Sequence, residues 1–170
     1  EPRYLPVPLS LTNNGHTLRA NIDNGSLLFG HNAYDLVQFH VHAPSEHLIE
    51  GEHYPLEIHF VNGTADGRMA VIGVLVKAGV FNPAFQTILD HAPVEVGRTI
   101  ETSLTIDPGQ LLPPNPEHFY TYAGSLTTPP CSEGVQWFVL QDVLEISAQQ
   151  IETFTSRFYH DNARTEQRLN

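Results

Sequence analysis

Histidines alternate with apolar residues in the stretch QFHVHAPSEHLIEGEHYPLEIHF, and this pattern constrains the chain more than any other feature. Residues two apart in a β-strand point to the same face. Gln38, His40 and His42 therefore share one face of a first strand, while Glu57 and His59 share one face of a second. If the two strands pair antiparallel, the three histidines converge on one point.

Three neutral imidazoles with an open fourth position form the ligand set of a catalytic zinc ion, as distinct from a closed structural site. Gln38 and Glu57 are placed to accept hydrogen bonds from the second ring nitrogens, which fixes the tautomer and orientation of a ligand. The alternative interpretation is a polar sheet face with scattered histidines. The third histidine, His59, and the two acceptors favour the metal site.

Length, composition and charge limit the classes of protein to which the chain can belong. A chain of 170 residues fits a single domain, 1–170, with a substantial core. Eight Lys and Arg residues against nineteen Asp and Glu residues give a formal net charge of −11. We therefore expect no nucleic-acid partner, since such binding depends on basic clusters. No apolar run reaches the roughly 20 residues that span a bilayer, so we expect no membrane span.

The secondary-structure pattern is typical of a mainly β protein. Turn signals such as NNG, NGTADG and PPNP separate short apolar or alternating runs. The expected strands lie at 16–22, 26–30, 36–42, 56–61, 69–79, 103–107 and within 134–146. Expected helices lie at 82–90 and 147–158, where Ser147 is a candidate N-cap. The prediction is a large, mostly antiparallel twisted central sheet with a few short peripheral helices.

Two further segments carry candidate functional residues. In TYAGSLTTPPCSEGVQWFVL, Thr127 and Thr128 precede a Pro-Pro pair and are polar for an ordinary strand end. Composition alone also allows a proline-stiffened loop. The turn NNGH delivers His16 to the start of a strand, which an exposed turn histidine would explain equally well.

Taken together, these segments resemble the α-class carbonic anhydrases. FHVHAPSEH is similar to that family's first zinc segment, LEIHFV to the strand with the third ligand, SLTTPPCSEGVQW to its gate segment, and NNGH to its proton-shuttle turn. The motifs follow the family's order from about Asn13 to Asn162. The Ala-Pro pair after His42 and the wording PPCSEGV are closer to bacterial or plant members than to animal ones.

The resemblance implies a cofactor and a reaction. Zinc (Zn²⁺) would be held by His40, His42 and His59, and a zinc-bound hydroxide would hydrate carbon dioxide reversibly to bicarbonate and a proton. Thr127 would accept a hydrogen bond from that hydroxide and donate its own proton to Glu46. These are the roles of the matching positions in the family.

The same resemblance assigns substrate contacts. Thr128 would contact bicarbonate, and His16 would carry the product proton to solvent. Side esterase activity and sensitivity to sulfonamides would accompany the main reaction, in a monomer or homodimer with a small-molecule substrate. The apolar pocket for carbon dioxide would be formed by Val61, Val71, Leu126, Val135 and Trp137.

The chain departs from the family pattern in places. It begins at Glu1, after the point where the family has an N-terminal segment rich in aromatic residues. In bacterial-type members that segment carries the cysteine expected to pair with the one matched by Cys131, which implies a periplasmic or secreted protein. Arg19 stands at a cavity-wall position where the family usually has a small amide.

Two other readings stay open at this stage. His-x-His followed by Glu46 also matches a cupin, with the glutamate as a ligand for iron or manganese. Cupins have a glycine six residues before the first histidine, where this chain has Tyr34. The second reading is a non-enzymatic binding module on the carbonic anhydrase fold, although such members typically lose a ligand histidine and none is lost here.

Overall fold

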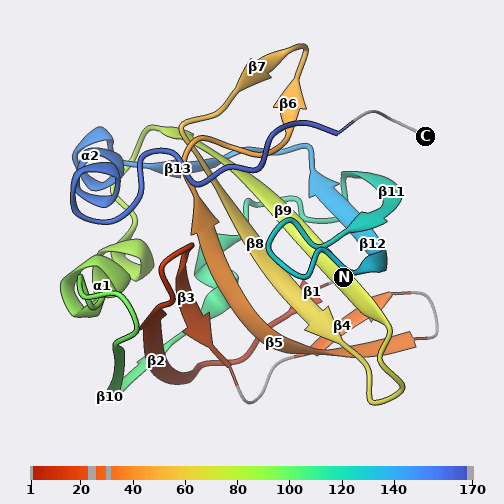
Figure 1. Cartoon of the computed structure of the whole chain (residues 1–170), viewed down its shortest axis with the longest axis horizontal. Coiled ribbons are helices and arrows are strands. Elements are labelled where there is room, and N and C mark those ends of the chain that lie inside the picture. Colours follow the sequence, from red (N-terminus) through yellow and green to blue (C-terminus); the bar gives the residue numbers. More distant parts are fainter. Residues whose placement is uncertain (1, 23–25, 30–31, 168–170) are drawn as a thin grey trace.

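A large twisted sheet dominates the computed structural model of the chain (Figure 1). The structure describes residues 2–22, 26–29 and 32–167. The strands are β1 (Pro2–Arg3), β2 (Val7–Asn13), β3 (Leu18–Asn21), β4 (Ser26–Phe29), β5 (Asn32–His42), β6 (Leu48–Ile49), β7 (Glu52–His53), β8 (Leu56–Gly63), β9 (Met69–Ala78), β10 (Thr99–Ile106), β11 (Phe119–Ser125), β12 (Glu133–Leu140) and β13 (Leu144–Ile146). The helices are α1 (Pro83–His91), the 3-10 helix η1 (Pro108–Leu111) and α2 (Ala148–Arg157).

Eleven strands of the described chain join one sheet, whose main path runs β10-β2-β3-β5-β8-β9-β12-β11. β4 pairs with β1 and β5, while β6 and β7 form a separate hairpin. The described pairings are antiparallel except β12 with β9 and β13 with β9, which are parallel. The fold is therefore the mainly antiparallel sheet that the sequence predicts, with a parallel part that the sequence does not predict.

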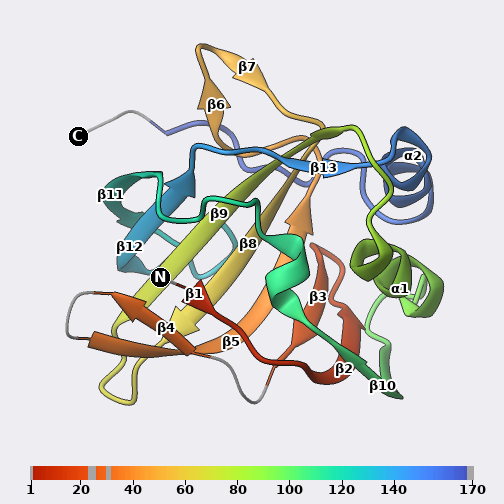
Figure 2. The same cartoon turned by 180° about the vertical axis from the view of Figure 1, so that it is seen from behind.

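One face of the sheet carries the main apolar core. Phe39 of β5 lies opposite Phe60 of β8, with ring centroids 5.5 Å apart. The core extends to Leu111 of η1, Phe85 of α1 and Phe154 of α2, and Figure 2 shows η1 crossing this side of the sheet. Because successive strand residues alternate between faces, the neighbours of these aromatic residues point to the opposite side.

The two predicted α-helices are present, close to their expected ends. Asn82 caps α1 by accepting a hydrogen bond from the backbone N–H of Phe85, and Pro83 occupies the first turn, where its missing N–H is tolerated. Ser147 and Gln150 form a reciprocal capping box at the start of α2. No helix in the described ranges is long and apolar enough to cross a membrane.

Five observed strands lie outside the predicted set: the two-residue strands β1, β6 and β7, and the longer strands β2 and β11. β2 contains Pro8, which normally argues against a strand, but its alternate residues are buried and it pairs with the edge strand β10. β11 is largely exposed, so its sequence lacks an alternating apolar pattern. The predicted strand at 26–30 corresponds to β4, and Gly30 lies outside the described residues.

Candidate metal centre

Two paired strands bring three buried histidines together on the face of the sheet opposite the main core. In the antiparallel register of β5 and β8, His40 lies directly opposite His59, and His42 lies opposite Glu57. The three imidazole centroids are 4.7–5.2 Å apart, and one nitrogen of each ring lies within 4.8 Å of the others. The strand parity in the sequence thus corresponds to a compact cluster of nitrogen donors.

The rings of His40 and His42 are each fixed through Nδ1. His40 Nδ1 lies 2.8 Å from Gln38 Oε1, and His42 Nδ1 lies 3.1 Å from the backbone oxygen of Asn162. In the described structure the Nε2 atoms of both rings are buried and have no hydrogen-bond partner. A buried, unpartnered nitrogen is costly unless a ligand occupies it, so these atoms fit a metal.

His59 is held from behind by Glu57. Its Nε2 lies 2.9 Å from Glu57 Oε1, a charge contact whose geometry falls outside that of a hydrogen bond. This contact leaves Nδ1 as the nitrogen of His59 that is available to bind a metal. A Cβ at Gly73, opposite His59 on β9, would lie 2.7 Å from Glu57 Oε1, so the glycine makes room for the carboxylate.

Glu57 also anchors a second histidine. Glu57 Oε1 lies 2.6 Å from His47 Nδ1, and Glu57 Oε2 accepts hydrogen bonds from the backbone N–H groups of Glu46 and His47, both at 2.9 Å. His47 Nε2 in turn lies 2.7 Å from the Tyr122 hydroxyl. The carboxylate behind His59 is therefore the centre of a continuous polar network.

The charge states favour metal binding by neutral imidazoles. Burial, with a further contribution from neighbouring His59, lowers the pKa of His42 to about 4 and that of His40 well below its usual range. Burial opposes ionisation of Glu57, but His59 and His47 outweigh it and hold its pKa well below the usual range. Near neutral pH His40 and His42 therefore offer uncharged nitrogens, and the Glu57 carboxylate lies beside them in the same cluster.

Glu46 lies beside the cluster without belonging to the set of donors. Its Oε1 accepts a hydrogen bond from the backbone N–H of Arg164 at 2.7 Å and lies 3.4 Å from His42 Nδ1. Its Oε2 is buried, and in the described residues nothing donates to it. No hydrogen bond joins it to Thr127 in this part of the chain, so the expected contact between the two stays a prediction.

The segment containing Thr127 and Thr128 is a loop between β11 and β12. The backbone oxygen of Thr128 accepts a hydrogen bond from Cys131 N–H at 2.9 Å. Arg164 donates through Nη1 to Ser125 Oγ at 3.2 Å and to the carbonyl of Leu126 at 3.5 Å. The backbone N–H of Arg164 also donates to Glu46, which lies beside the histidine cluster. Arg164 therefore connects this loop to the cluster.

The residues expected to form an apolar pocket lie together next to the histidines. Val61, Val71, Val135 and Trp137 are buried in one cluster, and Leu126 packs against it. The Trp137 ring is centred 4.8 Å from that of His59. The cluster is separate from the main core of the sheet.

His16 is exposed, at the turn before β3. Its backbone N–H donates to Asn14 Oδ1 at 2.9 Å, and its carbonyl accepts from Asn162 Nδ2 at 2.9 Å. The backbone oxygen of Asn162 also lies within hydrogen-bond distance of His42 Nδ1, so Asn162 connects the His16 turn to a histidine of the cluster. Asn162 and Arg164 could not be assigned from the sequence, because their contacts with His42 and Glu46 use a backbone carbonyl and a backbone N–H and join segments more than 100 residues apart.

A second group of possible metal donors, His47, Glu57 and His59, is less suitable than the first. Its members already contact one another, with 2.6 Å between His47 and Glu57. Neither group within the described residues includes Glu46, which the cupin reading requires as a ligand. The donor set is three histidines, which is typical of zinc.

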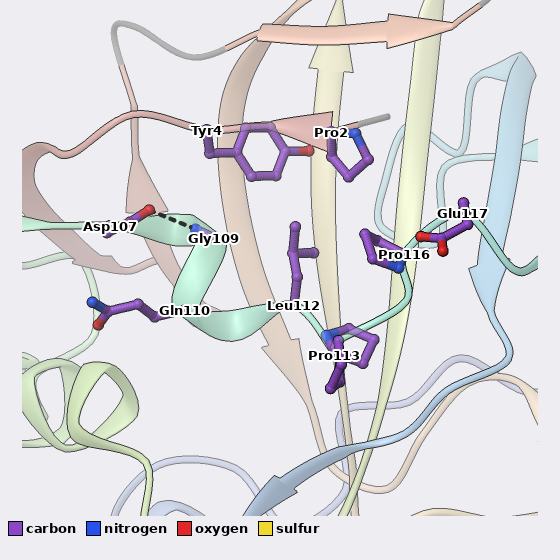
Figure 3. A pocket seen from close by; sticks show the side chains of 10 residues that line it. Pro2, Tyr4, Asp107, Gly109, Gln110, Leu112, Pro113, Pro116 and Glu117 are labelled. Carbon is purple, nitrogen blue, oxygen red and sulfur yellow. Dashed lines mark hydrogen bonds between the residues drawn. The ribbon is translucent and has the colours of Figure 1, made fainter.

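The hollow in Figure 3 lies away from this cluster. It has a volume of about 550 Å³ and is lined by η1, the proline-rich segment after it, and Tyr4. Asp107 on its rim caps η1 by accepting a hydrogen bond from Gly109 N–H at 2.9 Å. None of its lining residues belongs to the histidine cluster or its partners.

Comparison with known proteins places the chain in a family. The family model described as eukaryotic-type carbonic anhydrase matches residues 4–170. A carbonic anhydrase of Nostoc sp. is 44% identical over 170 residues, which cover 98% of this chain and 63% of the relative. A carbonic anhydrase of Pectobacterium atrosepticum is 42% identical over 163 residues, which cover 94% of this chain and 66% of the relative.

A solved structure supports the same assignment. The α-carbonic anhydrase of Thermovibrio ammonificans, in complex with the inhibitor sulfanilamide, matches with a TM-score of 0.95 and 41% identity, covering 100% of this chain and 75% of that one. The chain spans less than two thirds of the length of either curated relative named above. By sequence and by fold, the chain belongs to the eukaryotic-type, or α, carbonic anhydrase family.

Proposed function

We propose that the chain catalyses the reversible hydration of carbon dioxide to bicarbonate and a proton, with zinc as its cofactor. The observation that carries this proposal is the cluster of His40, His42 and His59, in which two buried Nε2 atoms lack a partner while the opposite nitrogens are held. Membership of the carbonic anhydrase family supports the reaction.

Zinc would be held by the three histidines of the cluster. When bound, it supplies a Lewis acid that makes water reactive near neutral pH, an effect for which carbonic anhydrases are themselves the standard example. Gln38, Glu57 and the carbonyl of Asn162 would keep the rings in position. Such supporting partners keep a ligand in the tautomer and orientation that binding requires.

Carbon dioxide is uncharged and needs an apolar wall more than a charged anchor. The cluster of Val61, Val71, Val135 and Trp137, with Leu126, offers that wall beside the histidines. Thr128, which follows on the same loop, would contact bicarbonate through its hydroxyl. Product and substrate would therefore be bound by neighbouring but chemically different groups.

Thr127 and Glu46 would orient the reacting water. Glu46 Oε2 is a buried acceptor without a donor among the described residues, and the Thr127 hydroxyl is the donor that we assign to it. With its proton directed to Glu46, the hydroxyl can act only as an acceptor toward the reacting group. Arg164, in the C-terminal segment, donates to Glu46 and to Ser125, which lies two residues before Thr127.

His16 would export the product proton. It is exposed at the turn before β3, and a histidine side chain can take up and release protons around neutral pH. We extend the proposal to side esterase activity, to inhibition by sulfonamides, and to a monomer or homodimer in the periplasm or outside the cell. A disulfide from Cys131 to a cysteine elsewhere in the full protein belongs to the same proposal.

Stopped-flow measurement of carbon dioxide hydration, paired with zinc analysis, tests the proposal. Thr127→Ala should retain zinc but lose about 10²–10³-fold in activity, the typical effect of removing a group that orients a reacting atom. Thr105→Ala, at an exposed position of the edge strand β10, is the matched control and should behave like the parent. A zinc-loaded parent that hydrates no carbon dioxide would favour the binding-module reading instead.

A further inference from the structure

Arg19 is a cation on the same face of the sheet as the histidine cluster. It lies on β3 directly opposite His40 of β5, so the two side chains leave the sheet on the same side. The charge of Arg19 therefore lies beside the cluster, on its β3 side.

The guanidinium has no carboxylate partner. Arg68, Lys77 and Arg98 each form an ion pair with an acidic side chain. Within the described residues Arg19 forms none, and its buried Nε makes no hydrogen bond. A partly buried cation without a partner is unexpected in a chain with a net charge of −11, because burial of an unpaired charge is costly.

The surroundings of Arg19 are hydroxyls and amides. Its other register partner is Thr12 on β2. The Thr12 hydroxyl is hydrogen-bonded to the Thr99 hydroxyl at 2.8 Å and accepts a hydrogen bond from Asn21 Nδ2 at 3.0 Å. The carboxylate on this side of the face, Glu101, lies on β10 beyond β2 and accepts a hydrogen bond from Ser10. An anion near Arg19 would thus meet a cation and neutral polar groups.

From this arrangement we infer that Arg19 forms a binding position for small planar oxyanions beside the metal centre. A guanidinium presents parallel N–H groups that match the spacing of two oxygens on one such anion. The inference rests on the proposed function in one respect, because the natural ligand of this class would be the product bicarbonate. Arg19 then determines anion affinity and the concentration of bicarbonate at which dehydration saturates.

Nitrate is a suitable probe, because it is planar, carries three oxygens and undergoes no hydration or dehydration. Its affinity can be measured by calorimetry on the zinc-loaded chain, while the guanidinium signals of Arg19 are followed by NMR. Arg19→Gln should weaken nitrate binding by about tenfold or more, since hydrogen bonds to charged groups contribute strongly. Arg19→Lys keeps the positive charge but lacks the paired N–H groups of the guanidinium. Its nitrate affinity should therefore lie between that of the parent and that of Arg19→Gln.

Arg98→Gln is the matched control, because Arg98 is exposed and already paired with Glu95. Circular dichroism verifies the fold of each variant, and Arg19→Lys keeps the test valid if Arg19→Gln is unstable. Equal nitrate affinity in the parent and both Arg19 variants would overturn the inference. If nitrate binding depends on Arg19 but the chain hydrates no carbon dioxide, the anion position is supported and only the proposed hydration reaction is contradicted.

Discussion

The two sides of the histidine cluster, on one face of one sheet, are chemically opposite. Toward β3 and β2 the residues in register with the cluster are Arg19, Asn21 and Thr12. Toward β9 and β12 lie Val71 and Trp137, in register with Val61 two residues along β8 from His59, and the Trp137 ring is centred 4.8 Å from that of His59. One face of the sheet thus passes from a charged wall through the histidines to an apolar wall.

A sheet built in this way can accommodate an apolar substrate and charged products at one point. In the proposed reaction carbon dioxide requires the apolar side, whereas bicarbonate and the proton require the polar side. The sheet provides both because neighbouring strands differ in composition while the register keeps their side chains on the same face. Changes on the two sides should therefore have different kinetic signatures.

The largest effect is expected where both sides depend on the same support, at Glu57. Glu57→Gln removes the charge behind His59 and the acceptor for His47. We expect zinc affinity to fall by about 10–100-fold, the usual result of losing a group that holds a metal ligand. Competition with a chelator measures the affinity, and Glu95→Gln at an exposed surface pair is the control. Unchanged affinity would show that the network does not support the metal.

Val71→Thr should break the apolar side alone. Val71 is buried between Val61 and Trp137, and a hydroxyl without a partner there costs about 1–3 kcal/mol. We expect a lower free energy of unfolding by denaturant and a higher KM for carbon dioxide, with one zinc still bound. Val37→Thr, at a half-exposed position, should change neither quantity. A KM like that of the parent would contradict the role of the apolar wall.

The smallest effect is expected at His16, which is exposed at the turn before β3. His16→Ala should lower kcat in weak buffer by no more than about tenfold, because water relays can replace part of the transfer by a single positioned group. The ratio kcat/KM should stay close to that of the parent, since proton export follows the chemical step, and imidazole buffer should restore kcat. His118→Ala is the control at another exposed histidine. A parallel fall in kcat/KM would mean that His16 is only a turn residue.

The strands that carry the three histidines could be predicted because the pattern in them is local. Residues at 40, 42 and 59 share faces by strand parity, and their convergence needed only an antiparallel pairing of two strands close in sequence. The same parity places Gln38 beside His40 and Glu57 behind His59. Local rules are sufficient when the partners are separated by a short connection.

Long-range parts of the structure could not be predicted in this way. The parallel pairing of β12 with β9 joins segments about 65 residues apart without a local signal. Asn162 contacts His42 through a backbone carbonyl, and every residue has one. Pro8 and the exposure of β11 concealed two strands, because edge positions relax the rules that central strands obey.

The three-histidine site is tested most directly by a zinc titration of the metal-free chain, with carbon dioxide hydration measured at each step. We expect activity to rise linearly and stop at one zinc per chain, and His59→Ala to abolish both tight binding and activity. Activity without zinc, or a stoichiometry and activity in His59→Ala equal to those of the parent, would contradict the assignment of the three-histidine site.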